Sequence, residues 1–266
     1  MTQVVAHRGA SHEVAEHTLA AYERAITDGA DALECDVRLT RDGVLVCVHD
    51  RRVDRTSNGR GVVSTLELAD LAELDFDVRR RQRDALLTAD WEEPDRDRSG
   101  VLTLERLLAL VTDCSRAVEL HIETKHPTRY AGRVERTLTE LLGSFGIAEA
   151  CRVDGRCPVT MMSFAPVGLR RMHAYAPGVP TVLLMDRVPR WLRDGTLPAN
   201  VRAAGPSLEV LRRDPAYVAR VHEQGHRVHV WTVDEPGDVD FVLSLGVDAV
   251  ITNRPRIVRE RVGIAE

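Results

Sequence analysis

Short apolar runs alternate with amphipathic stretches along almost all of the 266 residues. This alternation predicts an α/β fold, a (β/α)8 TIM barrel with a closed parallel sheet. The chain length suits one such barrel of about 250 residues, so we expect residues 1–266 to form a single domain. Several apolar runs end in polar or glycine-containing turns, as barrel strands do at their active face.

Eight of the runs have the length and composition of barrel strands. They are Gln3–Ala6, Ala32–Val37, Ala117–Glu123, Val159–Ser163, Thr181–Leu184, Ala203–Pro206, Arg227–Thr232 and Ala249–Thr252. Apolar periodicity near 3.6 residues predicts helices at Thr18–Asp28, Leu104–Val111, Arg129–Leu142, Pro166–Tyr175, Pro215–Gln224 and Pro236–Leu245.

Two regions depart from the alternation. The pair Asp42-Gly43 predicts a β-hairpin extension after the second strand. A two-residue turn there would pair Arg41 with Val44 and place Asp36 opposite His49. A polar insertion follows at roughly residues 51–100, and its later part is dense in arginine and aspartate. We expect that later part to be a solvated surface loop, with an active-site lid as the alternative.

The composition bounds the class of partner. The net charge of -5 gives no global positive field that would attract nucleic acid or an anionic membrane. No run approaches the ~20 apolar residues of a membrane span, and the first residues lack a signal-peptide pattern. The cysteines, expected to be free thiols of a cytoplasmic protein, are Cys35, Cys47, Cys114, Cys151 and Cys157.

Glu34 and Asp36 carry the first sign of chemistry. Residues two apart on a strand face the same side, so both carboxylates would lie together among apolar neighbours. A divalent cation such as Mg²⁺ or Ca²⁺ would relieve their repulsion and desolvation. The pair alone would fit an exposed strand edge with two solvated acids better.

His49 favours a functional site over an exposed strand edge, because the expected hairpin places its imidazole beside the two acids. His7 and Arg8 follow the first strand, at the face where barrel enzymes have their active sites. The planar guanidinium of Arg8 suits a phosphate group. A lone His-Arg pair after a strand would otherwise be ordinary polar termination.

Glu123 and Lys125 complete the candidate site. They share one face of a strand, where Glu123 would be a third metal ligand and Lys125 would reach a phosphate oxygen. An ordinary Glu-Lys pair at a strand end is the alternative. Three carboxylates, two histidines and two cationic groups together predict metal-assisted phosphoryl chemistry with acid–base help. The sequence has no Walker loop, dinucleotide fingerprint or base-reading motif.

Motifs along nearly the whole chain resemble those of the glycerophosphodiester phosphodiesterase family. They are His7-Arg8-Gly9, residues 29–43, 46–50, 55–61 and 102–105, Glu123-Thr124-Lys125, Met162-Ser163-Phe164, and residues 230–233 and 246–255. The resemblance implies hydrolysis of small glycerophosphodiesters to glycerol 3-phosphate and an alcohol, with one divalent cation, Mg²⁺ or Ca²⁺. From the charge and the lack of long apolar runs we expect no nucleic-acid partner and no stable membrane insertion.

The resemblance also implies a role for each candidate residue. His7 and His49 would be the acid–base pair, Glu34, Asp36 and Glu123 the metal ligands, Arg8 and Lys125 the phosphate contacts, and Trp231 the lining of the glycerol end. In the mechanism it implies, a glycerol hydroxyl attacks phosphorus, the alcohol leaves, and water opens a cyclic phosphate.

The chain departs from the family pattern at two positions. Glu16-His17-Thr18 replaces Glu-Asn-Thr, and Thr252-Asn253 replaces Thr-Asp. We expect His17 near the N-terminus of the next helix, as a neutral hydrogen-bonding residue; a ring in solvent is the alternative. We interpret Asn253 as structural.

Two other functions compete with this hypothesis. A related barrel of the lysophospholipase D or sphingomyelinase D type would need an exposed apolar rim. The charged segment at residues 75–100 disfavours such a rim, whereas Trp191-Leu192 favours it. A catalytically inactive binding barrel would have lost an acid or a histidine, and the motif residues are complete.

Overall fold

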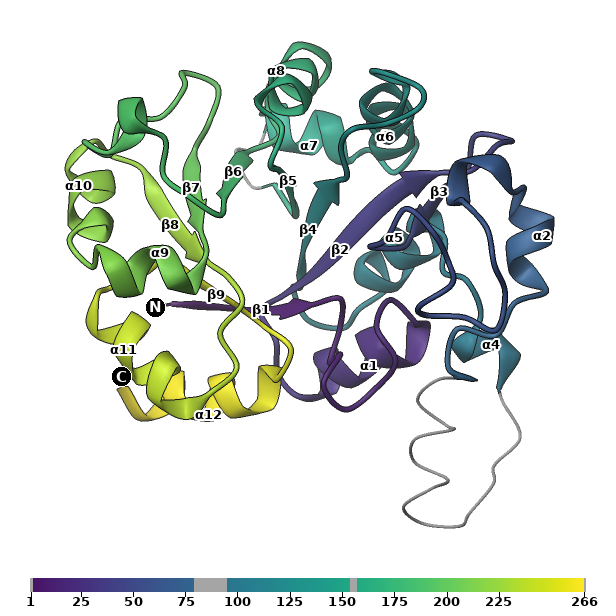
Figure 1. Cartoon of the computed structure of the whole chain (residues 1–266), viewed down its shortest axis with the longest axis horizontal. Helices are drawn as coiled ribbons and strands as arrows, with labels where there is room; N and C mark the ends of the chain where they lie inside the picture. Colours follow the sequence, from purple (N-terminus) through teal and green to yellow (C-terminus); the bar gives the residue numbers. More distant parts are fainter. Residues whose placement is uncertain (1, 79–94, 154–156, 266) are drawn as a thin grey trace.

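A computed structural model describes residues 2–78, 95–153 and 157–265, and it has the predicted barrel (Figure 1). Eight parallel strands close because β1 pairs with both β2 and β9. The strands are β1 (Gln3–His7), β2 (Ala32–Leu39), β4 (Glu119–Thr124), β5 (Val159–Ser163), β6 (Thr181–Met185), β7 (Ala203–Pro206), β8 (Arg227–Val230) and β9 (Ala249–Thr252). The predicted strands are thus confirmed to within about two residues at each end.

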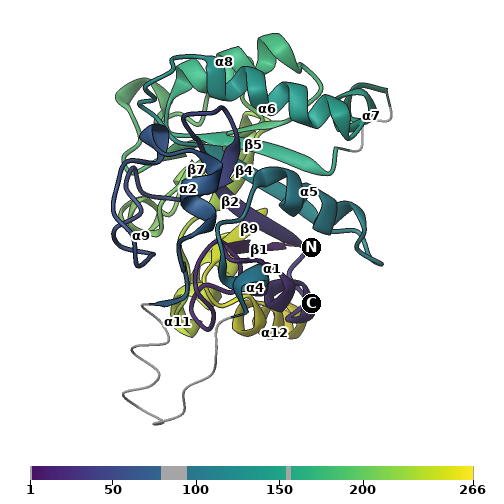
Figure 2. The ribbon, with the colours of Figure 1, turned by 90° about the vertical axis from the view of Figure 1, so that its right-hand side faces the viewer.

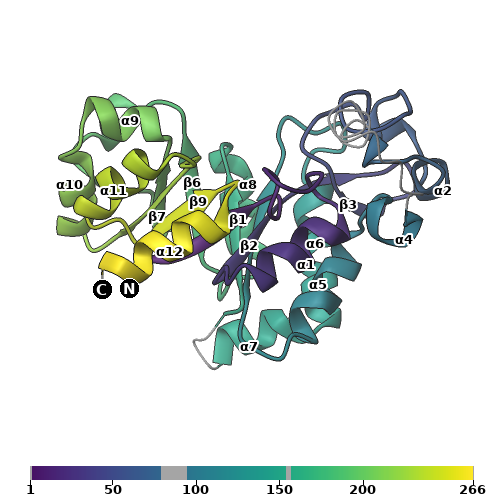
Figure 3. The same cartoon turned by 90° about the horizontal axis from the view of Figure 1, so that it is seen from below.

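The helices lie around the outside of the sheet, as Figures 2 and 3 show. They are α1 (Leu19–Thr27), α2 (Leu68–Ala72), α4 (Arg96–Ser99), α5 (Leu104–Thr112), α6 (Arg133–Ser144), α7 (Ile147–Val153), α8 (Pro166–Tyr175), α9 (Leu208–Arg213), α10 (Tyr217–Glu223), α11 (Pro236–Ser244) and α12 (Pro255–Ala265), with 3₁₀ turns η1 (Val63–Thr65) and η2 (Arg190–Leu192). Within the described residues, no helix is long and apolar enough to cross a membrane.

Strand β2 shows how the fold separates its core from its site. Cys35 and Val37 point outward and are buried in the core that the strands share with the helices. Ala32 joins a separate apolar cluster inside the barrel. Because side chains alternate along a strand, Glu34 and Asp36 point into the same interior, above Ala32 and toward the carboxyl end.

The hairpin is present, but its register differs from the prediction. Strand β3 (Leu45–Cys47) pairs with β2 so that Val37 lies opposite Cys47. The backbone N–H of Val48 donates to the carbonyl of Asp36, so His49 is not opposite Asp36. The cause is a longer turn, which Thr40 closes: its Oγ1 accepts the N–H of Val44 at 2.8 Å. The extra residue shifts every later pair by one position.

The insertion after the hairpin is less polar than expected in its first half. Residues 51–78 contain η1 and α2 and share an apolar cluster with the hairpin, which is formed by Val46, Val48, Val53, Val63, Leu71 and Phe76. Residues 79–94 lie outside the described residues. They include most of the segment that we expected to be a solvated loop or a lid, so that expectation stays a prediction.

The expectation of free thiols is wrong for one pair of cysteines. Cys151 lies in α7 and Cys157 lies just before β5, and a disulfide joins them across Cα atoms 4.3 Å apart. The two cysteines are six positions apart in the sequence. Cys35 and Cys47 are buried free thiols, as expected, and Cys114 is free and half-buried. The cytoplasmic location stays a prediction.

Candidate active site

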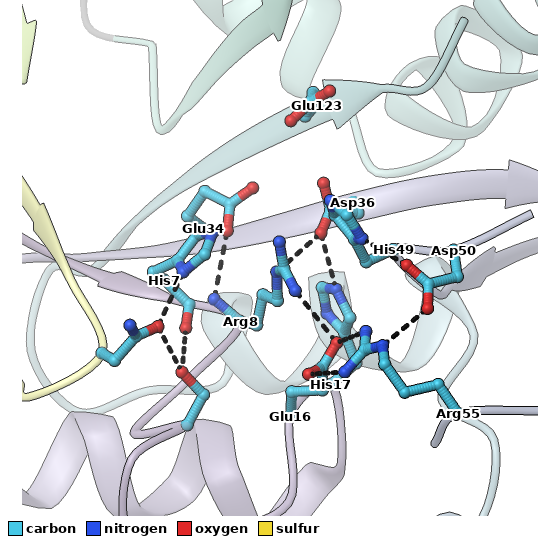
Figure 4. A network of polar contacts seen from close by, with 12 residues as sticks. His7, Arg8, Glu16, His17, Glu34, Asp36, His49, Asp50, Arg55 and Glu123 are labelled. Carbon is cyan, nitrogen blue, oxygen red and sulfur yellow. Dashed lines mark hydrogen bonds and ion pairs between the residues drawn. The ribbon is translucent and has the colours of Figure 1, made fainter. Parts of the chain in front are cut away.

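Six of the eight candidate residues lie at or near the carboxyl ends of β1, β2 and β4, namely His7, Arg8, Glu34, Asp36, Glu123 and Lys125. Figure 4 shows the first five of them. The register of the parallel strands explains the gathering, because His7 of β1 is paired with Glu34 of β2, and Asp36 of β2 is paired with Glu123 of β4. Every second residue of each strand faces the barrel interior, so these four side chains meet at one end of it.

The three predicted metal ligands form one cluster. Oxygens of Glu34, Asp36 and Glu123 lie within 4.8 Å of one another, and all three side chains are buried. Burial, and then the charge of Asp36, raises the pKa of Glu34 well above its usual range and that of Glu123 to about 8. Three buried carboxylates cannot all ionise without a compensating cation. A set of hard oxygen donors fits Mg²⁺ or Ca²⁺.

Asp36 is the most heavily contacted carboxylate of the cluster. Its Oδ2 lies 3.0 Å from Nε of Arg8 and 2.9 Å from Nε2 of His17, and its Oδ1 lies 2.9 Å from Nζ of Lys125. Burial alone would raise the pKa of Asp36. The hydrogen bond from His17 and the charges of Lys125 and Arg8 reverse that effect and hold it well below the usual range. Asp36 is therefore the anionic centre of the site.

Two cationic side chains flank the carboxylates as the sequence predicts. Lys125 also lies 2.9 Å from Oε1 of Glu123. Arg8 adopts a left-handed backbone with φ of 58°, and its N–H donates to the Glu34 side chain at 3.1 Å. A non-glycine residue in this region is strained, and such strain is concentrated at functional sites. Its guanidinium also contacts Glu16 at 3.1 Å.

His7 lies against the end of β9. Its Nδ1 is 2.7 Å from Oδ1 of Asn253. Burial, and then the charge of Arg8, lowers the pKa of His7 to about 4. The ring is therefore neutral at pH 7, which suits a group that must accept a proton.

His49 is held from the opposite side, on the hairpin. Arg38 donates to its backbone carbonyl at 3.0 and 2.7 Å, and its Nδ1 lies 2.7 Å from Oδ1 of Asp50. Burial lowers the pKa of His49, and the charges of Arg8 and Lys125 add to this; the charge of Asp36 and the hydrogen bond to Asp50 oppose the shift without reversing it. Figure 4 shows the ring between these two carboxylates. The shifted hairpin register therefore still brings His49 to the site, although not by direct pairing with Asp36.

Three residues without a predicted role, Glu16, Asp50 and Arg55, connect the two sides of the site. The guanidinium of Arg55 contacts Glu16 through two bonds of 2.7 Å and Asp50 through one of 2.6 Å. Burial would raise the pKa values of both acids, but the bonds from Arg55 lower each to about 2. Since Glu16 also holds Arg8, Arg55 links the supports of Arg8 and His49. The signal was its place in the matched segment at residues 55–61.

The two departures from the family pattern both lie at the site. His17 is buried and adjoins Thr18, the N-cap of α1; its Nδ1 lies 2.8 Å from the Tyr22 hydroxyl. Its predicted place beside the helix start is confirmed, and the alternative of a ring in solvent is wrong. The interpretation of Asn253 as structural is incomplete, because its side chain contacts His7.

Trp231 follows β8 on a different side of the barrel mouth. Its indole Nε1 donates to the carbonyl of Gly205 at 2.7 Å, and its ring packs on the inner apolar cluster. Phe164, which is 40% exposed, meets this ring edge-on with centroids 5.3 Å apart. The two aromatic rings form an apolar wall at the mouth, and the role of Trp231 in lining the glycerol end stays a prediction.

Residues 7–257 match the model of the Glycerophosphoryl diester phosphodiesterase family. The chain belongs to this family. Membership confirms the resemblance found in the sequence and the hydrolase class that it implies.

Similar proteins support the assignment. A Mycobacterium tuberculosis protein named "Probable glycerophosphodiester phosphodiesterase 1" is 47% identical over 258 residues, which are 95% of this chain and 89% of that protein. The Bacillus subtilis "Glycerophosphodiester phosphodiesterase" is 31% identical, covering 94% of this chain and 83% of that one. The structure of an Oleispira antarctica phosphodiesterase in complex with the product sn-glycerol-3-phosphate superposes with a TM-score of 0.83 at 21% identity, covering 99% and 97% of the two chains. At that identity it supports the fold.

Proposed function

We propose that this protein hydrolyses glycerophosphodiesters to glycerol 3-phosphate and an alcohol, using one Mg²⁺ or Ca²⁺ ion bound by Glu34, Asp36 and Glu123. The observation that carries the proposal is the buried carboxylate cluster, with oxygens within 4.8 Å of one another. Arg8 and Lys125 flank it. Family membership and the product-bound Oleispira antarctica relative support the substrate class.

The side chains divide the work in this proposal. Arg8 and Lys125 hold the phosphate, and Trp231 lines the glycerol end. His7, held by a neutral amide, accepts the proton of the attacking glycerol hydroxyl, and His49, held by the Asp50 carboxylate, donates a proton to the leaving alcohol. Water then opens the resulting cyclic phosphate and gives glycerol 3-phosphate. The bound cation would supply Lewis acidity at a phosphoryl oxygen.

Chelation tests the metal requirement. Excess EDTA should abolish hydrolysis of glycerophosphocholine, and Mg²⁺ or Ca²⁺ should restore it, because the carboxylates need a cation to be ionised together. Calorimetry should show that Glu34→Gln weakens cation binding at least tenfold. Glu119→Gln is the matched control, since Glu119 lies on the same strand as Glu123 but binds Gln3 at 2.9 Å. Full activity in excess chelator would sink the proposed site.

A second candidate substrate has an apolar tail. A cavity of about 410 Å³ lies beside the exposed Trp191 and is lined by Pro166, Arg170, Trp191, Leu192, Thr196, Leu197, Pro198, Asn200 and Val201. This cavity favours a lysophospholipid, which is itself a glycerophosphodiester. Comparing kcat/KM for glycerophosphocholine and lysophosphatidylcholine decides between the two substrates. If lysophosphatidylcholine is a substrate, Trp191→Ala should lower kcat/KM for it and leave kcat/KM for glycerophosphocholine unchanged.

A further inference from the structure

Asn253 lies between His7 and a carboxylate that sequence analysis did not single out. Its Oδ1 is 2.7 Å from Nδ1 of His7, and its Nδ2 donates to Oδ2 of Asp234 at 2.6 Å. Its backbone N–H donates to Oδ1 of the same Asp234 at 2.7 Å, and its carbonyl accepts the N–H of His12 at 3.1 Å. The residue is therefore fixed at both ends, between the segment after β1 and the segment after β8.

The hydrogen-bond network assigns the orientation of the amide. Besides the two N–H groups of Asn253, the carboxylate of Asp234 accepts the hydroxyl of Thr252 at 3.0 Å. That hydroxyl accepts the N–H of Arg254 at 3.0 Å, so its own proton points to Asp234. An ionised carboxylate offers acceptors and no donor. The amide NH₂ of Asn253 must therefore face Asp234, and its oxygen must face His7.

This orientation selects one tautomer of His7. An amide oxygen can only accept, so Nδ1 of His7 carries the proton of the 2.7 Å contact. In the neutral ring, Nε2 is then the bare nitrogen with its lone pair. Ser11 does not alter the assignment: its hydroxyl lies 2.7 Å from the His7 carbonyl and 2.8 Å from the same amide oxygen, and both neighbours are acceptors.

We propose that Asn253 is the positioning residue of His7, fixing the imidazole as the Nδ1–H tautomer so that Nε2 accepts the proton of the attacking hydroxyl. The proposal rests on the catalytic role proposed above for His7. A carboxylate at position 253 would face that of Asp234 across the 2.6 Å contact, without a donor between them.

Three variants separate the hydrogen-bond pattern from the charge. Asn253→Leu removes the acceptor with little change of volume, and kcat should fall about 10–100-fold while KM changes less than threefold. Asn253→Asp alone should lower both kcat and Tm, because two carboxylates then face each other. Asn253→Asp combined with Asp234→Asn restores one donor and one acceptor, and kcat should recover to within about tenfold of the native value. A swap as impaired as Asn253→Leu would overturn the proposal.

Asn58→Leu is the matched control. Asn58 also accepts an N–H through its side-chain oxygen, at 2.9 Å from Asp75, but it is exposed and outside the site. This variant should keep native kcat. An equal loss of activity in the control would assign the effect to general loss of an asparagine hydrogen bond, and the positioning role would be rejected.

The ¹⁵N spectrum of the histidine rings tests the tautomer without any activity measurement. Among the ten histidines, the His7 signals are those absent from His7→Gln. They should show a protonated Nδ1 and a bare Nε2 in the native protein and in the swap, and this preference should be lost in Asn253→Leu. A native ring protonated at Nε2 would refute the positioning role. If the native ring is the Nδ1–H tautomer but His7→Gln keeps native turnover, the catalytic role of His7 is refuted and the assignment of the tautomer stands.

Discussion

His7 and His49 are the same side chain supported by two different regions. The rigid barrel supports His7, through the neutral amide of Asn253 at the end of β9. The hairpin extension supports His49, through the carboxylate of Asp50 and the half-exposed Arg55. Burial lowers the pKa of both rings, and at His49 the hydrogen bond to the Asp50 carboxylate opposes this shift. A carboxylate stabilises an imidazolium more than a neutral amide does. In the mechanism proposed above, this difference in support gives one site a base and an acid from one residue type.

The largest expected effect compares the two histidines directly. His7→Ala and His49→Ala should each lower kcat for glycerophosphocholine by about 10²–10⁴-fold. With a 4-nitrophenyl diester of glycerol phosphate, whose leaving group needs no proton, His49→Ala should regain most of its activity and His7→Ala should not. Lys125→Ala should lower kcat/KM for both substrates alike, since it binds charge in ground and transition states. If His7→Ala and not His49→Ala regained activity with this substrate, His7 would be the acid and His49 the base.

Asp50→Asn makes the two supports alike by giving His49 a neutral partner. The amide can still accept from Nδ1, but it no longer stabilises the imidazolium, so kcat for glycerophosphocholine should fall about 10–100-fold. The 4-nitrophenyl substrate should show a much smaller loss. Asp54→Asn is the control, because Asp54 pairs with Arg52 on the surface. A native kcat in Asp50→Asn would show that the charge on the His49 side is not used.

The sequence predicted the barrel because its strands carry local signals, namely apolar runs and polar ends. It also placed Glu34, Asp36 and Glu123 on one interior face, since alternation along a strand needs no tertiary information. The hairpin register could not be predicted from Asp42-Gly43 alone. Thr40 closes a longer turn through its own side chain, and that bond is visible only in three dimensions.

The supports of the histidines were beyond sequence reasoning for a related reason. Asn253 and His7 are 246 positions apart, and Arg55 and Glu16 are 39 apart, so no spacing rule connects them. Each pair meets because barrel closure or the insertion brings distant segments together. The disulfide between Cys151 and Cys157 was missed because cysteine spacing alone does not report the distance between two Cα atoms.

His17→Asn should have a smaller effect, because His17 contacts the proposed metal ligand Asp36 and neither of the two histidines with proposed catalytic roles. It donates through Nε2 to Asp36, which accepts bonds from Arg8 and Lys125 as well. We expect the cation requirement to be unchanged and kcat to stay within about tenfold of native, equivalent to ~1.4 kcal/mol. The neutral state of this ring stays a prediction. A collapse of kcat comparable to that of His7→Ala would place His17 in the chemistry.

Arg55→Met should have the smallest effect and tests the charged support through stability. Glu16 and Asp50 have folded pKa values of about 2, below their ordinary values of 4.5 and 3.8. Their contribution to stability is therefore fully present above about pH 4.5 and is lost as the pH falls through 2. Because the network is partly exposed, it contributes on the order of 1 kcal/mol, or about 2–4 °C in Tm.

Thermal unfolding of native protein and Arg55→Met from pH 7 to pH 2.5 measures that contribution. The difference in Tm should be largest at pH 7 and should shrink below about pH 4.5, as protons replace Arg55 on the two acids. Arg52→Met removes an exposed pair with Asp54 and should change Tm little at either pH. Because His7 is neutral in the folded protein, the protein also becomes less stable as the pH falls from 6.5 toward 4. This loss is the same in the native protein, Arg55→Met and Arg52→Met, so it cancels when their Tm values are compared. A difference in Tm that stays constant down to pH 2.5 would show that Arg55 acts by packing. The charged support of His49 through Arg55 and Asp50 would then be rejected.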